Sequence, residues 1–197
     1  MVVAPAYLLY RRLELLFPFF SFGMAEYALQ ALILLLLVLL MKKGKLSYLL
    51  SFAAAVLYGI FLDISMAFTA SLPAGGVLLR GAVYLCGALI CTAAISLLFR
   101  TYLPPEAYEL FVKELARKFR KPIPFVKTLY DCGSLLVSVA VSFALFGKIL
   151  GIGPGTVICA LVNGSLIQLF TTIFDRLFLF RDRFALRHYF EEREESL

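Results

Sequence analysis

Asp63 is the single charged residue in the apolar stretch between Leu46 and Leu72. A carboxylate within a membrane-spanning helix costs at least ~2.5 kcal/mol on insertion scales, so it normally faces the interior of a helix bundle. Asp63 is a candidate site for an ion, a proton or a substrate ammonium group; the alternative is a structural carboxylate bonded to neighbouring hydroxyls. Its helical face also carries small residues at every fourth position, which let backbones approach closely: Ser51, Ala55, Gly59, Ala67 and Ser71.

Asn163 is the corresponding polar residue in the uncharged stretch Gly151–Phe174. At 1.5 Å per residue, Asp63 and Asn163 each lie roughly 15 Å from the outer end of their predicted helix. We therefore expect both side chains near the middle of the bilayer, where they could share one polar layer. The spacing leaves open whether the two side chains face each other.

A stripe of polar residues marks the fourth apolar stretch of the chain. Asp131, Ser134, Ser138 and Ser142 recur at three- or four-residue spacing, which places them on one helical face. We expect Asp131 in the first turn of its helix and close to Lys127, so a surface ion pair is its simplest role. The serines are candidates to line a cavity, although serines in such positions more often bond their own helix backbone.

The turn Gly151–Thr156 precedes the last apolar stretch and is rich in glycine. Pro154 suits the first position of a helix, and the free N–H groups at a helix start are donors that can hold an anion. Gly153, Gly155 and Thr156 would form that site. The alternative is a tight turn between two spans, and the lack of a lysine after the glycines excludes a P-loop.

Catalytic and metal chemistry find little support in the sequence. The single histidine, His188, lies in a charged tail, so no Ser-His-Asp triad can be assembled. The four cysteines have spacings that match no zinc or C-x-x-C motif, and we expect free thiols: Cys86, Cys91, Cys132 and Cys159. We therefore expect no enzyme activity, no cofactor and no metal site.

The composition indicates that the solvent of this chain is lipid. Of the 197 residues, 62% are hydrophobic and 16% are charged, whereas soluble domains carry about 25% charged residues. The mean hydropathy is +0.91. The net charge of +6 is concentrated in loops between apolar stretches, which indicates membrane topology and argues against nucleic-acid binding. The expected partners are the lipid bilayer and a small-molecule solute or ion, with a homo-oligomer or a partner subunit as further options.

Five apolar stretches are long enough to cross a bilayer, so the sequence predicts an all-α, polytopic membrane protein. Residues 1–23 are predicted to form an interfacial or re-entrant segment, residues 100–127 a loop, and residues 176–197 a charged tail. The predicted spans are 24–41, 46–72, 77–99, 128–147 and 153–174.

The loop contains one amphipathic helix, predicted over Glu106–Lys121. Pro104 and Pro105 precede it and Pro122 ends it. We expect it either on the cytoplasmic membrane surface, with its basic side toward anionic lipid, or packed on the ends of the spans. The apolar side consists of Tyr108, Phe111, Val112, Leu115 and Phe119, and the basic side of Lys113, Arg117, Lys118 and Arg120.

The distribution of basic residues predicts the orientation. The segment 42–45, the loop 100–127 and the tail carry 15 of the 19 lysines and arginines, so these segments are expected in the cytoplasm. Five spans with a cytoplasmic C-terminus would leave Arg11 and Arg12 outside. We therefore expect six spans in the natural protein, with the first one preceding this chain.

Three segments together resemble a known family: LYGIFLDI (57–64), VKTLYDCGSLLVSVAVSFALFG (126–147) and GIGPGTVICALVNGSLI (151–167). They are similar to the YczE/YyaS/YitT-type bacterial integral membrane proteins. The resemblance implies a six-span protein of the bacterial inner membrane, of uncharacterised function and often guessed to be a transporter. This chain departs from that pattern by lacking the first span.

The sequence thus favours a small-solute transporter or permease with a polar site between its helices. One alternative is a substrate-binding membrane subunit of a multi-component uptake system, which would need a separate energy-supplying partner. The other is a membrane scaffold that transports nothing, which would have a dry and fully packed interior.

Overall fold

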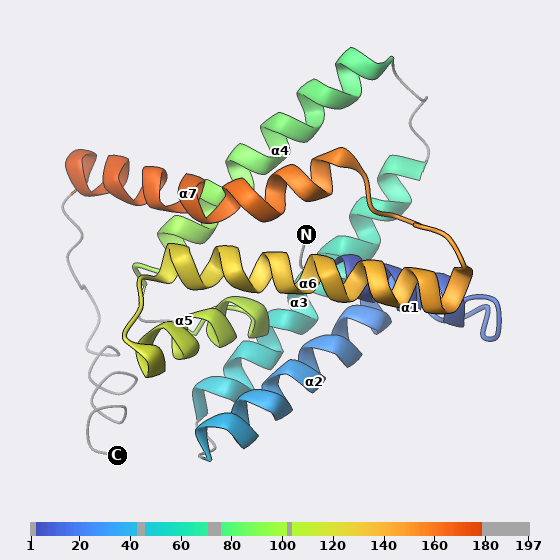
Figure 1. Ribbon diagram of the computed structural model, residues 1–197, viewed down its shortest axis with the longest axis horizontal. Helices are drawn as coiled ribbons and strands as arrows, with labels where there is room; N and C mark the ends of the chain where they lie inside the picture. Colours follow the sequence, from blue (N-terminus) through green and yellow to red (C-terminus); the bar gives the residue numbers. More distant parts are fainter. Residues whose placement is uncertain (1–2, 43–45, 71–75, 102–103, 179–197) are drawn as a thin grey trace.

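The computed structural model describes residues 3–42, 46–70, 76–101 and 104–178, and the regular structure within them is entirely helical (Figure 1). The predicted all-α fold is therefore confirmed. The helices are α1 (Ala4–Leu13), α2 (Phe22–Met41), α3 (Leu46–Ala70), α4 (Val77–Leu98), α5 (Ala107–Phe119), α6 (Ile123–Phe146) and α7 (Pro154–Leu177). Most of the predicted tail, residues 179–197, lies outside the described residues.

Five of these helices, α2, α3, α4, α6 and α7, are long and apolar enough to cross a membrane. The prediction of five membrane spans is confirmed. The largest difference in bounds is at α6, which begins at Ile123 and not at residue 128, because Pro122 is extended and Pro124 fits the first helical turn. Asp131 consequently lies about two turns inside α6, and its expected position in the first turn is wrong.

The helices pack as connected pairs (Figure 1). Helix α2 packs along α3, α6 packs along α7, and α4 packs against α7. Helix α1 lies against α2 and α6, and α5 contacts α2, α3 and α6. Helices α5 and α6 therefore connect the α2–α3 pair to the α4–α7 side of the molecule.

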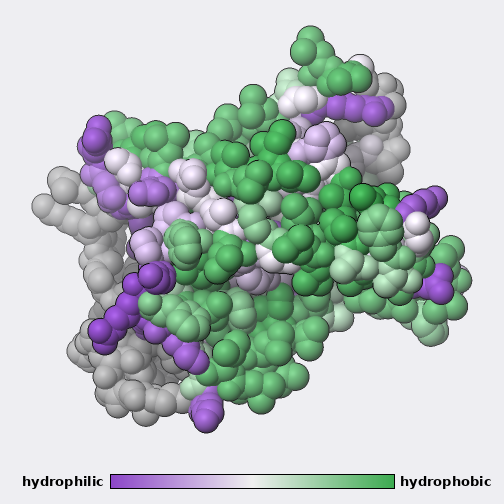
Figure 2. Space-filling model, viewed as in Figure 1, coloured by the Kyte–Doolittle hydropathy of each residue, from purple (hydrophilic) through white to green (hydrophobic). Residues whose placement is uncertain are grey.

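The surface of the molecule is largely apolar. Figure 2 shows hydrophobic residues over most of the face drawn, with hydrophilic residues gathered at its margins. Leu36 on α2, Phe61 on α3 and Leu136 on α6 are examples of large apolar side chains that are exposed. Exposed apolar area of this extent is unfavourable in water and favourable in lipid, so the fold agrees with a multi-pass membrane protein.

The N-terminal segment contains α1, whose ten residues are too few to cross a bilayer. Ala6 and Leu8 are fully buried, and the ring of Tyr7 packs edge-on against Phe22 at a centroid distance of 5.8 Å. The segment predicted as interfacial or re-entrant thus contains a short helix docked on α2 and α6.

Helix α5 occupies the second of its two predicted placements, packed against spans. It buries Tyr108, Val112 and Ala116, and also Glu109 and Glu114, whereas a helix lying on a membrane surface would keep carboxylates in water. Phe119, assigned to its apolar side, is 60% exposed. The helix ends at Arg120, which adopts a left-handed conformation with φ of 51°.

Candidate functional site

Lys127 is a fully buried lysine on α6 that forms ion pairs with two carboxylates. Its Nζ atom lies 2.5 Å from Oε1 of Glu109 and 3.3 Å from Oδ1 of Asp131. The side chains of all three residues are at most 3% exposed. Lys127 and Asp131 are four positions apart and so share one face of α6, while Glu109 comes from α5. Three ionisable groups from two helices therefore meet away from water.

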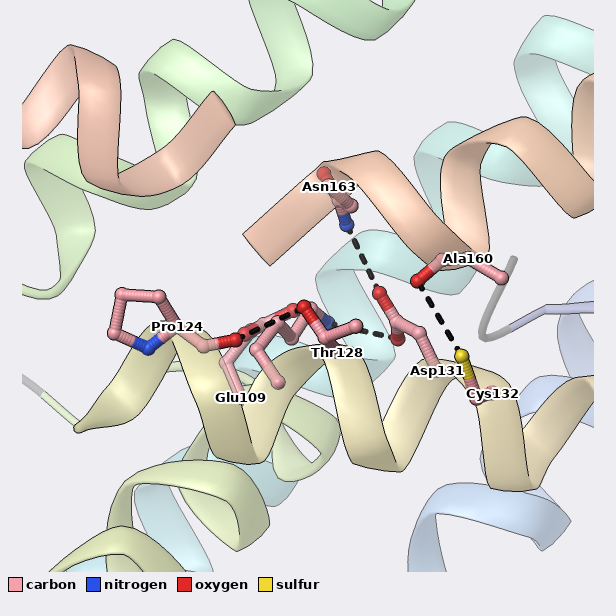
Figure 3. Close-up of polar contacts among 8 residues, drawn as sticks. Glu109, Pro124, Thr128, Asp131, Cys132, Ala160 and Asn163 are labelled. Carbon is pink, nitrogen blue, oxygen red and sulfur yellow. Dashed lines mark hydrogen bonds and ion pairs between the residues drawn. The ribbon is translucent and has the colours of Figure 1, made fainter. Parts of the chain in front are cut away.

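Asn163 brings a third helix to this group. Its Nδ2 atom donates a hydrogen bond to Oδ2 of Asp131 at 3.1 Å, and Figure 3 shows the Asn163 side chain pointing from α7 toward Asp131. We call Glu109, Lys127, Asp131 and Asn163 the acid–lysine cluster. It joins α5, α6 and α7 through side-chain hydrogen bonds.

The close approach of α6 and α7 depends on Gly164, next to Asn163. A methyl group at this position would collide with Oγ1 of Thr128 and with the carbonyl oxygen of Pro124. Those two atoms are already bonded to each other, with the Thr128 hydroxyl donating at 3.1 Å (Figure 3). A side chain at 164 would therefore push α7 away from α6 and lengthen the Asn163–Asp131 bond.

The acid–lysine cluster holds more carboxylates than cations. Burial raises the pKa of Glu109 above its ordinary value, and the nearby Lys127 ammonium acts in the opposite direction. The second oxygen of Glu109, Oε2, has no hydrogen-bond partner within the described part of the chain. An unpartnered carboxylate oxygen in a buried site is costly, and this oxygen retains the capacity to accept a hydrogen bond.

A second buried acid lies beside the first group, on the α2–α5 contact. Glu26 is fully buried, and its Oε2 atom accepts a hydrogen bond from the Tyr108 hydroxyl at 2.6 Å. Gln30, one turn further along α2, is also fully buried, and its Oε1 atom accepts from the Ala107 N–H at 3.2 Å. We call Glu26, Gln30 and Tyr108 the Glu26 cluster.

Glu106, at the start of α5, is a partly buried carboxyl close to both clusters. Its pKa is raised to about 8, chiefly by burial and also by Glu109 and Glu26, while Lys127 acts in the opposite direction. Burial likewise raises the pKa of Tyr108, with Glu26 adding to the effect. Lys127 thus forms ion pairs with Glu109 and Asp131 and interacts electrostatically with a third carboxyl group, Glu106.

The model of a family of unknown function (DUF6198) matches residues 3–172, which runs from the start of α1 into the last turns of α7. The chain belongs to this family. No curated protein and no solved structure matches it.

Asp63 and Asn163, which the sequence placed at similar depths in this DUF6198 chain, have different bonding partners. Its Oδ2 atom accepts from the Ser21 hydroxyl and its Oδ1 atom from the Gly23 N–H, both at 2.8 Å. Ser21 in turn caps α2 by accepting from the Met24 N–H at 3.1 Å. Asp63 thus fixes the start of α2, as in the structural alternative, while Asn163 is bonded to Asp131.

The other predicted site residues mostly complete local structure. The Ser138 hydroxyl donates to the Ser134 carbonyl at 2.7 Å, which is the bond expected of a serine that binds its own helix. In the turn before α7, Thr156 Oγ1 accepts from the Gly153 N–H at 3.2 Å, and the Gly155 carbonyl accepts from the Tyr84 hydroxyl at 2.6 Å. These contacts agree with a tight turn.

Glu26, Gln30 and Glu109 were not among the residues predicted from the sequence. A carboxylate in a span usually faces the bundle interior. Glu26 lies in a span as Asp63 does, so its buried position could have been predicted in the same way. Glu109 gave no such signal, because it sits in a short helix where a carboxylate is normally solvated. The ion pair of Asp131 with Lys127 was anticipated, but its surface location was wrong because α5 and α7 cover it.

Proposed function

We propose that this protein is a small-solute transporter or permease, and that the acid–lysine cluster is the polar site at which the solute binds. The supporting observation is that Lys127 and Asp131 lie in a membrane-spanning helix with side chains 1% and 0% exposed. Ionisable residues within spans usually mark the path of a substrate or an ion. The resemblance to YczE/YyaS/YitT-type proteins of the bacterial inner membrane supports the same proposal.

Stability alone is a weak reason for such a cluster. Replacing a buried ion pair by apolar residues is often neutral or stabilising by about 1–4 kcal/mol, because removing two charges from water is expensive. The cluster also places two carboxylates around one ammonium, and Oε2 of Glu109 has no bond in the described residues. This charge balance favours a solute that carries an amino, ammonium or guanidinium group. We assign no catalytic chemistry to the site.

The orientation in this proposal follows the basic residues, with the α5 region and the C-terminus in the cytoplasm. The acid–lysine cluster would then lie toward the cytoplasmic half of the bundle. The substrate-binding subunit of a multi-component uptake system is an alternative of the same architecture, and co-purification with an ATP-hydrolysing module would favour it.

Thermal unfolding of the purified full chain tests solute binding. The panel comprises amino acids, polyamines, choline and guanidinium, with neutral sugars and carboxylates as controls. A solute at one hundred times its Kd stabilises the folded state by ~2.7 kcal/mol, which corresponds to a rise in Tm of several degrees. The rise should disappear in Asp131→Asn and persist in Glu14→Gln, whose carboxylate is 37% exposed.

Uptake of the stabilising solute into proteoliposomes then tests transport. Saturable uptake by the wild type, reduced at least tenfold in Asp131→Asn, is expected. A chain that no cationic solute stabilises, and that moves none across the vesicle membrane, would be a scaffold and would overturn the proposal.

A further inference from the structure

The carboxyl group of Glu26 is buried without a cationic partner among the described residues. Glu26 is fully buried in α2, inside a membrane-spanning segment. Its Oε2 atom accepts from the Tyr108 hydroxyl, whereas its Oε1 atom has no hydrogen-bond partner in the structure described. The Nε2 atom of Gln30, one turn along the same helix, likewise has no hydrogen-bond partner among the described residues. One oxygen of the Glu26 carboxyl is thus buried without a hydrogen bond, and a second such polar atom lies one helical turn away.

The charged groups near Glu26 do not neutralise it. On α5, Glu106 interacts electrostatically with Glu26 and also with Lys127 on α6. The ammonium of Lys127 already forms ion pairs with Glu109 and Asp131. The tyrosines that interact electrostatically with Glu26 come from α3, α5 and α6 and are neutral near pH 7: Tyr58, Tyr108 and Tyr130.

Other titratable groups on the helices that pack against α2 have partners of their own. On α5, Arg117 pairs with Glu114, and Lys118 donates to the Leu40 carbonyl near the far end of α2. On α3, Asp63 accepts from Ser21 and Gly23 at the start of α2. On α1, Arg11 pairs with Glu14 at 3.3 Å and is 47% exposed. Tyr10 also donates to Glu14, at 2.7 Å, and Arg12 is exposed. Each of these groups therefore has a partner or water of its own.

We propose that Glu26 is a proton-binding site, whose carboxyl group is a neutral acid in the resting protein. An ionised carboxylate in this setting would lack both water and a cation, and a buried charge without either is strongly unfavourable. A proton on Oε1 removes the charge and leaves Oε2 free to keep the hydrogen bond from Tyr108. When the acid ionises, its O–H bond breaks, the electron pair stays on Oε1 and the proton passes to water.

This inference also deepens the proposed function, on which the following step rests. A proton that binds Glu26 would be the coupling ion for movement of a solute through the neighbouring acid–lysine cluster. Tyr108 and Glu109 are adjacent in α5, so a shift of this helix that alters the Glu26–Tyr108 bond would also alter the Glu109–Lys127 pair. Helix α5 would thereby connect the proton site to the solute site.

Infrared spectroscopy tests the proton site without any solute. The full chain in dodecyl maltoside, which has no ester carbonyl, should show the C=O stretch of a protonated carboxyl group at pH 7. Glu26→Gln should remove this band, and Glu14→Gln should keep it. Glu106→Gln identifies any separate band from Glu106, because burial raises the pKa of that carboxyl to about 8.

Tyr108→Phe provides a second test, which holds even if the Glu26→Gln variant does not fold. Loss of the phenol donor should shift the frequency of the Glu26 band and leave the band present. A spectrum without a band that responds to either Glu26→Gln or Tyr108→Phe would overturn the inference.

Uptake under a pH gradient separates this inference from the proposed function. With a stabilising solute from the panel, the wild type should accumulate solute when a gradient is imposed. Glu26→Gln should allow equilibration with at least tenfold less accumulation. A Glu26 band without any uptake by the wild type would overturn transport and leave the proton site standing, whereas gradient-driven accumulation that is unchanged in Glu26→Gln would overturn the coupling.

Discussion

Asn163 and Asp131 are separated by 32 positions in the chain, yet the Asn163 amide nitrogen lies 3.1 Å from a carboxylate oxygen of Asp131. The other oxygen of Asp131 faces Lys127. One oxygen of this buried carboxylate therefore contacts α7, and the other contacts Lys127 one turn earlier on α6. Lys127 extends the connection to α5 through Glu109. A change in the charge of Asp131 would consequently be felt in α5, α6 and α7 together.

Lys127→Met should destabilise the protein strongly. The substitution keeps the length of the side chain but leaves Glu109 and Asp131 as buried carboxylates without their cation, which typically costs about 3–5 kcal/mol. Adding Glu109→Gln and Asp131→Asn to Lys127→Met should recover much of the loss, because the buried charges are then gone. Circular-dichroism melts in detergent measure the effect, and Lys121→Met, at an exposed position, is the matched control. Equal melting temperatures for the two methionine variants would contradict an ionised cluster.

Gly23→Ala should separate α2 from α3. The added methyl group would collide with the carboxylate of Asp63 and lie 2.9 Å from the carbonyl oxygen of Gly59. Forcing extra volume into such a contact typically costs about 1–3 kcal/mol. Gly81→Ala is the control, because a methyl group there meets no atom within 4 Å and alanine favours a helix by up to about 1 kcal/mol. The prediction fails if both alanine variants melt at or above the wild-type temperature.

The membrane spans could be predicted from the sequence because hydropathy and length are local properties of the chain. Residues 77–99 were predicted as a span and α4 covers Val77–Leu98. The small-residue stripe of α3 likewise indicated a close helix contact, and Gly59 does lie against Gly23. The bundle-facing position of Asp63 followed from the same pattern, and Asp63 is bonded to the start of α2.

The composition of the clusters could not be predicted, because it depends on which helices are neighbours. Asn163 and Asp63 have similar depths, but α7 packs along α6 while α3 packs along α2. The depth of Asp131 was misjudged because prolines at 122 and 124 suggest a loop, whereas they form the cap and first turn of α6. The amphipathic pattern located α5, but the same pattern fits packing on a lipid surface and packing against α6, where Lys127 pairs with Glu109.

Cysteine labelling of intact cells should confirm opposite sides for the two ends of α6. Lys121, before the helix, and Lys148, after it, are both exposed. In a background without the four native cysteines, a membrane-impermeant maleimide should label Lys148→Cys from outside and Lys121→Cys only after permeabilisation, as the basic residues predict. The reverse pattern would place the C-terminus outside.

Glu106 should make the protein less stable as the pH rises. In the folded protein burial raises the pKa of this carboxyl to about 8, whereas its ordinary value is 4.5. Between these two values the folded state binds a proton that the unfolded state has lost, so the free energy of unfolding falls as the pH increases. Each kcal/mol lost lowers the Tm by roughly 2–4 °C for a chain of this size.

The Glu106→Gln variant isolates this contribution. Glutamine mimics the protonated acid and does not titrate, so melts between pH 5 and pH 9 should show a flatter decline in Tm than the wild type. Some decline should persist, because burial also raises the pKa of Glu109. Glu14→Gln should leave the wild-type slope unchanged, since that carboxylate is at the surface and paired with Arg11. If Tm falls with pH at the same rate in the wild type and in Glu106→Gln, Glu106 is ionised in the folded protein at neutral pH. Its carboxyl group would then be exposed to water, which would contradict the burial described above.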